Sequence, residues 1–201
     1  MRSTYALASA TGLVLLASAG VANASIIPLD GNGAFGTYTG SVGYSALTAT
    51  TGTLTLILTN TSPAPNGGFL TGVVVELPGP LAGSLASSTD ADFVGLTAVS
   101  AAPFGSYDIG AATGGNWEGG GPPSRGIAIG DSVTLVWNIF GTGAGAFDVT
   151  DLNLTASGQP SIAVRFRGFG NGESDKVPAL PAPGALVLAG MATALISRRQ
   201  R

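Results

Sequence analysis

The residues of this chain that can do chemistry are its carboxylates and its aromatic rings, because its 201 residues include no cysteine and no histidine. A Cys–His protease, a serine triad with a histidine base and a zinc or haem site of the usual ligands are therefore excluded. An enzyme built from what remains would need two facing carboxylates, the arrangement that hydrolyses glycosidic bonds. The position of each acid along the chain decides whether such a pair forms.

Glu76 and Glu118 are the two acids that such a hydrolase would use. Glu76 lies on the polar side of a predicted strand, and Glu118 lies in a glycine-rich loop. Nothing in their spacing places the two carboxylates together. We therefore expect a protein without enzymatic activity and without catalytic residues.

Trp117 is the aromatic residue with the most exposed setting, a run of glycine and asparagine beside Glu118. With Tyr107 nearby, its ring could stack on a sugar, so a carbohydrate-binding module using Trp117 is the alternative function. The other interpretation is that the ring folds back over the edge of the domain. Trp137 differs, because it shares one face of a predicted strand with other apolar residues, and we expect it in the core.

Oxygen-rich clusters raise the question of a metal ion, since calcium binds carboxylate and amide oxygens. The clusters are Asp30 with Asn32, Asp90 with Asp92, and Asp148 with Asp151 and Asn153. A calcium loop that began at Asp30 would have Ser41, and not glutamate, at its twelfth position. Solvated turns explain the same residues. We therefore expect no cofactor, with calcium as the alternative.

Arg165 and Arg167 lie two residues apart and share one face of a predicted strand. Cross-strand Asp or Glu side chains would pair with them there, and the solvated face of a sheet is the expected setting. An anion site is the alternative.

The charge of the central region, residues 25–176, excludes one large class of partner. It holds four basic and eleven acidic residues, which gives a net charge of −7. Binding to nucleic acid by phosphate neutralisation needs clustered lysine and arginine. We expect no nucleic-acid partner.

The central region alternates apolar and polar residues with the period of two that is typical of β-strands. The strongest candidate strands are residues 53–60, 71–77, 132–140 and 161–169, and weaker ones are 34–39, 43–49, 93–100 and 148–156. Turn-forming glycine and proline separate them. Strands with one apolar face must bury it against a second sheet, so the pattern predicts an all-β, antiparallel β-sandwich of about eight strands, with a single-sheet barrel as the alternative.

The N-terminus has the three regions of a secretory signal peptide. Arg2 supplies the positive start and Tyr5–Ala19 the apolar core, and Ala22 and Ala24 form the small-residue cleavage site ahead of Ser25. An uncleaved membrane helix is the alternative, but the apolar core is short and ends at a good cleavage site. Signal peptidase is therefore an expected partner.

The C-terminal segment, residues 177–201, reads as a sorting tail. Its parts are the motif Pro181, Ala182 and Pro183, an apolar helix over 184–197, and a membrane stop of Arg198, Arg199 and Arg201. Arginines at one end of an apolar helix favour the cytoplasmic side of a membrane. From Pro183 to Ser197 such a helix extends roughly 22 Å, short of a bilayer core of about 30 Å. Temporary retention in the membrane fits this length; a permanent tail anchor and a buried C-terminal helix are the alternatives.

These tail residues resemble the PEP-CTERM sorting domain of exported bacterial proteins, with Ala182 in place of the central glutamate of the family motif. The resemblance implies recognition and processing by an exosortase-type membrane enzyme. It also implies delivery to the cell surface or to an extracellular polysaccharide matrix, and it concerns destination more than activity.

Together these features divide the chain into a signal peptide (1–24), a β-sandwich domain (25–176) and a sorting tail (177–201). We expect an exported, non-enzymatic protein that associates with the membrane through its C-terminal helix during sorting. Its destination would be the cell surface or the extracellular matrix, where polysaccharide is a candidate partner.

Overall fold

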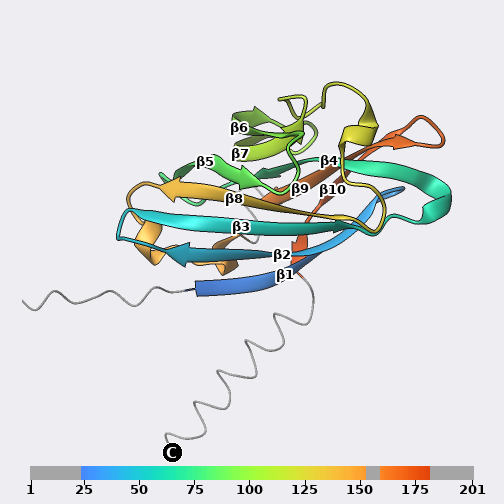
Figure 1. Ribbon diagram of the computed structural model, residues 1–201. Coiled ribbons are helices and arrows are strands. Elements are labelled where there is room, and N and C mark those ends of the chain that lie inside the picture. Colours follow the sequence, from blue (N-terminus) through green and yellow to red (C-terminus); the bar gives the residue numbers. More distant parts are fainter. Residues whose placement is uncertain (1–23, 153–158, 182–201) are drawn as a thin grey trace, which may run out of the picture.

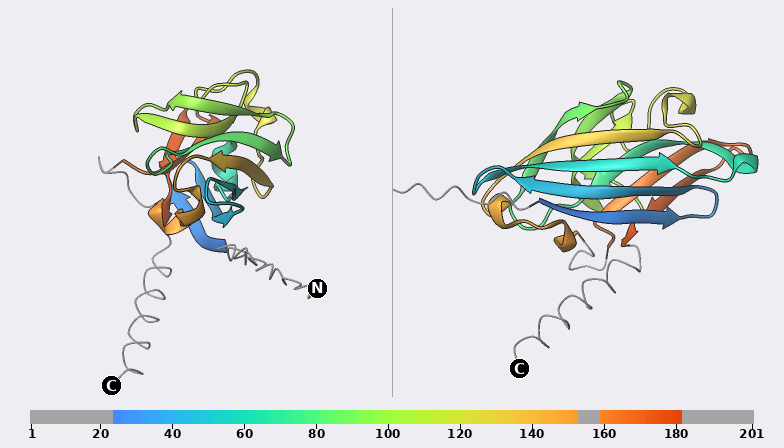
Figure 2. Two further views of the ribbon diagram at one scale, coloured as in Figure 1. Left: turned by 90° about the vertical axis from the view of Figure 1, so that its left-hand side faces the viewer. Right: turned by 60° about the horizontal axis from the view of Figure 1, so that its bottom comes forward.

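The alternating residues of the central region fold into two antiparallel sheets that pack face to face. The computed structural model describes residues 24–152 and 159–181, and Figures 1 and 2 show the two layers. The strands are β1 (Ala24–Asn32), β2 (Thr37–Ala46), β3 (Thr51–Asn60), β4 (Gly67–Val75), β5 (Ala82–Ser88), β6 (Phe93–Ser100), β7 (Ser106–Thr113), β8 (Ser132–Phe140), β9 (Ile162–Phe169), β10 (Ser174–Pro178) and β11 (Leu180–Pro181). The prediction of an all-β antiparallel fold is confirmed.

One sheet has six strands, in the order β11-β1-β2-β3-β8-β5, and the other has five, in the order β10-β9-β4-β7-β6. Every pair of neighbouring strands is antiparallel. The strands therefore form two separate sheets and not the single closed sheet of a barrel. The four short 3-10 turns of the described residues are η1 (Ala64–Asn66), η2 (Pro123–Arg125), η3 (Ala144–Ala146) and η4 (Val149–Asp151).

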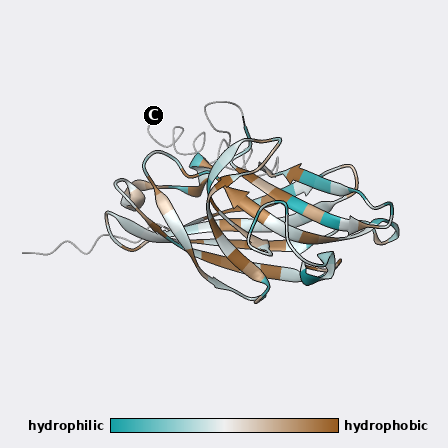
Figure 3. Cartoon of the chain, turned by 90° about the horizontal axis from the view of Figure 1, so that it is seen from above, coloured by the Kyte–Doolittle hydropathy of each residue, from teal (hydrophilic) through white to brown (hydrophobic). Residues whose placement is uncertain are grey.

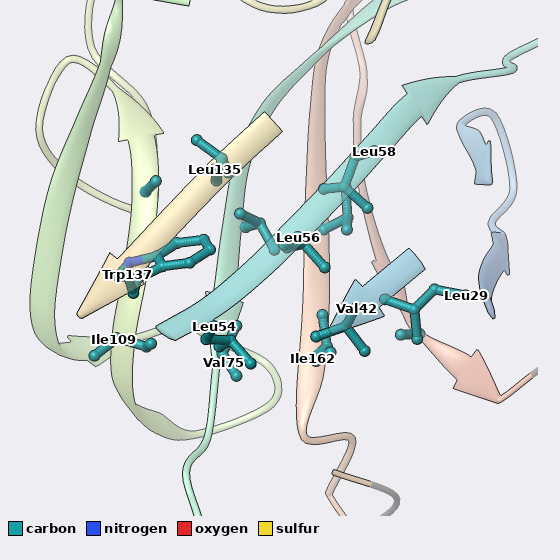
Figure 4. Close-up of a cluster of buried hydrophobic side chains, with 14 of the residues drawn as sticks. Leu29, Val42, Leu54, Leu56, Leu58, Val75, Ile109, Leu135, Trp137 and Ile162 are labelled. Carbon is teal, nitrogen blue, oxygen red and sulfur yellow. The ribbon is translucent and has the colours of Figure 1, made fainter. Parts of the chain in front are cut away.

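The core lies between the sheets and is built from the apolar face of each strand. Figure 4 shows Leu54 and Leu56 of β3 and Trp137 of β8, and it shows the opposite sheet contributing Val75, Ile109 and Ile162. Leu54, Leu56 and Trp137 are fully buried. Burial of such a side chain contributes about 1.5–3 kcal/mol. Figure 3 shows the origin of this packing, because apolar and polar residues alternate along the strands.

The predicted strands differ from the observed ones at several places, and β1, β5, β7 and β10 were not predicted. Residues 34–39 and 43–49 were predicted as two strands, but the single strand β2 overlaps both. Of residues 148–156, also predicted as a strand, 153–156 lie outside the described residues, and Asp148 is the N-cap of η4, where it accepts a hydrogen bond from the Thr150 N–H. An aspartate side chain that caps a helical turn competes with the extended backbone.

The sandwich continues past Lys176, where the sequence placed its end. Val177 is fully buried and pairs with Val164 of β9, and Ala179 is also buried. Pro181, the first residue of the proposed sorting motif, pairs with Leu29 of β1. At the other end β1 begins at Ala24, so the predicted N-terminal boundary lies at the start of this strand.

The predicted signal helix and the predicted apolar helix over 184–197 lie outside the described residues. Within 24–152 and 159–181, none of the helical segments has the length and the hydropathy that crossing a membrane requires.

Candidate functional site

The outward face of the six-stranded sheet carries a broad array of small polar side chains, which we call the hydroxyl face. Its members come from β2, β3 and β8: Thr37, Thr39, Ser41, Ser45, Thr53, Thr55, Thr59, Ser132, Thr134 and Asn138. They stand on alternate residues because their neighbours along each strand point into the core. The array repeats at about 4.8 Å between strands and roughly 6.7 Å along each strand.

The hydroxyl face is almost free of charge. Among the outward residues of β1, β2, β3, β5 and β8 only Asp30 has an ionisable side chain. Neighbouring hydroxyls hydrogen-bond each other, as between Thr59 Oγ1 and Ser132 Oγ at 2.7 Å. Apolar side chains interrupt the array at Ile26, which is 74% exposed, and at Ile57 and Phe140. Such a surface offers hydrogen bonds and small apolar contacts, and it holds no acid–base pair for catalysis.

Phe140 is the one aromatic among the large apolar residues that are exposed in the described part of the chain. A flat row of exposed rings would favour stacking on sugars, whereas a face of threonine and serine favours a structural role. The sequence showed the alternating threonines of β3. It did not show that β2, β3 and β8 lie side by side, because β8 follows β3 only after four intervening strands.

Trp117 lies on the loop after β7 and is only 3% exposed, which agrees with the interpretation that its ring folds back over the domain and not with a ring that is free to stack on a sugar. It packs with Val74, Tyr107 and Ala163 in a second apolar cluster on the outward face of the five-stranded sheet. Its indole Nε1 donates a hydrogen bond to the Ala102 carbonyl at 3.4 Å. Gly72 of β4 lies beside the ring, since a Cβ there would be in van der Waals contact with its Cε3 at 3.7 Å.

Tyr107, the second aromatic proposed to contact sugar, is buried beside Trp117. Its hydroxyl donates to the Pro160 carbonyl at 2.8 Å, and burial followed by the charge of Glu76 raises the pKa of Tyr107 to about 12. Neither ring has a free face for stacking. Trp137 lies in the core, as predicted.

Glu118, next to Trp117 on the same loop, is held by two cations. Arg165 Nη1 donates to Glu118 Oε2, and Lys176 Nζ lies 3.4 Å from Glu118 Oε1. Burial alone would raise the pKa of Glu118, but the hydrogen bond and charge of Arg165, together with Lys176, lower it below its ordinary value. The outcome is a carboxylate that stays ionised and ties the loop to the sheet.

Arg165 and Arg167 share the outward face of β9, as predicted, but their partners differ from those expected. The cross-strand neighbour of Arg165 is Lys176, a like charge, and the acid comes from the loop instead. The side chain of Arg165 is only 8% exposed because the loop covers it. Arg167 Nη2 donates to the Gly121 carbonyl at 3.4 Å. The solvated face expected for Arg165 is thus a covered one.

Glu76 and Glu118 have separate partners and do not face each other. Burial, followed by the nearby charge of Asp108, raises the pKa of Glu76. Asp108 in turn accepts a hydrogen bond from the Leu77 N–H at 2.8 Å. Glu76 lines a small recess with Tyr107 and Pro160, while Glu118 lies with Arg165 and Lys176.

The acids proposed for calcium take part in local hydrogen bonds. Asp90 Oδ1 accepts from the Asp92 N–H at 2.9 Å, and Asp151 Oδ2 accepts from the Asp148 N–H at 3.2 Å. In the described parts of the chain, no three acidic residues come together as a group that could hold a metal ion. Asn153 lies outside the described residues.

The residues proposed for processing are only partly described. Ala24 and Ser25 are the first residues of β1, and Ser25 Oγ accepts a hydrogen bond from the Val149 N–H at 3.3 Å. Ala22, Ala182, Pro183, Arg198, Arg199 and Arg201 lie outside the described residues.

No family model matches the chain, and comparison with curated proteins and with solved structures gives no match either.

Proposed function

We propose that the protein is an exported, non-enzymatic β-sandwich that is displayed on the cell surface or incorporated into an extracellular matrix. Its N-terminal signal sequence supports export by signal peptidase processing after Ala24. The tail with Pro181, Ala182 and Pro183 supports handling by an exosortase-type enzyme while the helix over 184–197 holds the chain in the membrane.

The observation that carries the non-enzymatic part of this proposal is the hydroxyl face. It spans the three neighbouring strands β2, β3 and β8, and the only ionisable outward residue of its sheet near it is Asp30 of β1. A face of this kind makes many weak, neutral hydrogen bonds and suits lateral contact with a hydrated matrix. The domain charge of −7 keeps individual molecules soluble until they arrive there.

A carbohydrate-binding module that uses Trp117 has less support, since the burial of Trp117 and Tyr107 leaves no stacking surface at that place. A hydrolase has less support still, because Glu76 and Glu118 do not face each other.

Cell fractionation with three chains tests the proposal: the full chain, a chain that ends at Pro181, and a chain that lacks residues 2–24. We expect the full chain at the cell surface or in the matrix, the chain ending at Pro181 in the medium, and the chain without residues 2–24 in the cytosol. If all three accumulate in the cytosol, the proposal fails.

A further inference from the structure

The four basic residues of the described sandwich gather around one loop. Arg165 and Arg167 lie on the outward face of β9, Lys176 lies opposite Arg165 on β10, and Arg125 ends η2. The glycine-rich loop, residues 114–121, packs on them. A Cβ at Gly119 would meet Arg167 Nη1 at 2.6 Å, and one at Gly121 would meet Arg125 Nη1 at 3.6 Å. A domain of net charge −7 thus concentrates its positive charge at one place.

These four residues, which we call the basic cluster, already bind one carboxylate of the protein itself. Glu118 contacts Arg165 and Lys176, yet its own side chain is 62% exposed, so the place where its oxygens sit is open to solvent. Gly115 and Gly119, on either side of it, have φ values of +77° and +75°. Glycine adopts such values without strain.

Glu118 does not provide a hydrogen-bond acceptor for every donor of the basic cluster. Arg165 Nε and Arg167 Nη1 are buried and have no acceptor within the described part of the chain. Buried guanidinium groups normally find an acceptor for each donor. The cluster therefore has capacity for more acceptor oxygens than Glu118 supplies.

A polar depression adjoins the cluster along the same loop. It has a volume of about 390 Å³, and its lining includes Thr97, Ser100 and Asn116 beside Leu96, Val99 and Trp117. Its hydroxyl and amide groups can hydrogen-bond the hydroxyls of a sugar. From β6, under the depression, to β9, under the cluster, the sheet extends across three strand spacings of about 4.8 Å each, roughly 14 Å.

We propose that the basic cluster is a carboxylate-binding site for an acidic oligosaccharide, in which Glu118 occupies the site until a sugar carboxylate displaces it. The ligand carboxylate binds Arg165 and Lys176 and reaches the unpaired donors of Arg165 and Arg167. The sugar hydroxyls bind Thr97, Ser100 and Asn116. This site is separate from the hydroxyl face, and it does not depend on stacking by Trp117.

Equilibrium titration of the purified sandwich with oligogalacturonate tests the proposal, with calorimetry and tryptophan fluorescence as readouts. Glu118→Gln removes the carboxylate that competes with the ligand for Arg165 and Lys176. It is expected to tighten binding by up to about fivefold, because an exposed ion pair contributes up to about 1 kcal/mol. Lys176→Gln is expected to weaken it. Arg165 is left intact because it is buried.

Two comparisons make the result specific. Asp131→Asn changes the net charge by the same amount at an exposed position just before β8 of the other sheet, and it is expected to leave binding unchanged. A neutral oligosaccharide of equal length is expected not to bind. Absence of binding to Glu118→Gln, or equal gains from Asp131→Asn, would overturn the proposal. Binding of oligoglutamate as tight as that of oligogalacturonate would overturn the assignment of a sugar ligand.

Discussion

Lys176 lies directly opposite Arg165 in the antiparallel pair formed by β10 and β9, so two like charges face each other on one side of the sheet. Like charges in opposite positions destabilise a sheet. The repulsion is offset by Glu118, which contacts both side chains from the loop above them. The stability of the β9–β10 pair therefore depends on the loop that places the Glu118 carboxylate between the two cations.

This link predicts a loss of stability in acid. The pKa of Glu118 lies below its ordinary value of 4.5, so its contribution is fully present above about pH 4.5 and is lost as the pH falls through the lowered value. Urea unfolding between about pH 2.5 and 6 measures it. The Glu118→Gln variant should show a shallower loss over that range. Identical pH profiles of the two proteins would contradict the link.

Burial of Trp117 predicts a large effect of its removal. Trp117→Ala should lower the free energy of unfolding by about 3–5 kcal/mol, because the change leaves a cavity in the outward apolar cluster. Val94→Ala, at a residue that is 50% exposed, is the control and should cost less than about 0.5 kcal/mol. Equal unfolding midpoints for the two variants would show that the Trp117 ring lies outside the fold.

The extent of the sandwich predicts where the chain can be shortened. A domain of residues 25–176 lacks the buried Val177 and Ala179 and the pairing of β11, and it should be less stable by roughly 2–4 kcal/mol than one of residues 25–181. Urea unfolding of the two domains measures the difference. Equal stability would mean that residues 177–181 belong to the tail and not to the core.

The hydroxyl face predicts which surface mutations reduce attachment to the matrix. The substitutions Thr55→Lys and Thr134→Lys place charge on the central strands of this face. A chain with both substitutions should be depleted from the matrix fraction and enriched in the medium. Ala91→Lys, at an exposed loop residue, is the control and should leave the distribution unchanged. Equal depletion by the control would indicate an effect of charge alone.

The sequence predicted strands well where large apolar residues alternate strictly with polar ones. Residues 132–140 were predicted with the bounds that β8 has, and residues 53–60 lie within β3. It failed at β7, whose second half consists of small residues, and at β10, which carries charge on two of its five residues beside the buried Val177. Alternation of side-chain size is absent from such segments, and tertiary packing alone defines them as strands.

The candidate sites depend on contacts between distant parts of the chain, and local patterns in the sequence do not predict such contacts. The hydroxyl face forms because β3 pairs with β8, which places Thr59 beside Ser132. Glu118 and Arg165 meet across 47 residues of sequence. The glycines around Trp117 suggested an exposed loop, but they allow close packing of the loop against the sheet, which buries the ring.

The central claim is that both ends of the chain direct export of the sandwich. Intact mass spectrometry of the protein from separated membrane, medium and cytosolic fractions tests it most directly. The account predicts a chain that begins at Ser25 in both exported fractions and, in the medium, ends near Pro183 without the three C-terminal arginines. A chain extending from Met1 to Arg201, recovered in soluble form from the cytosol, would contradict it.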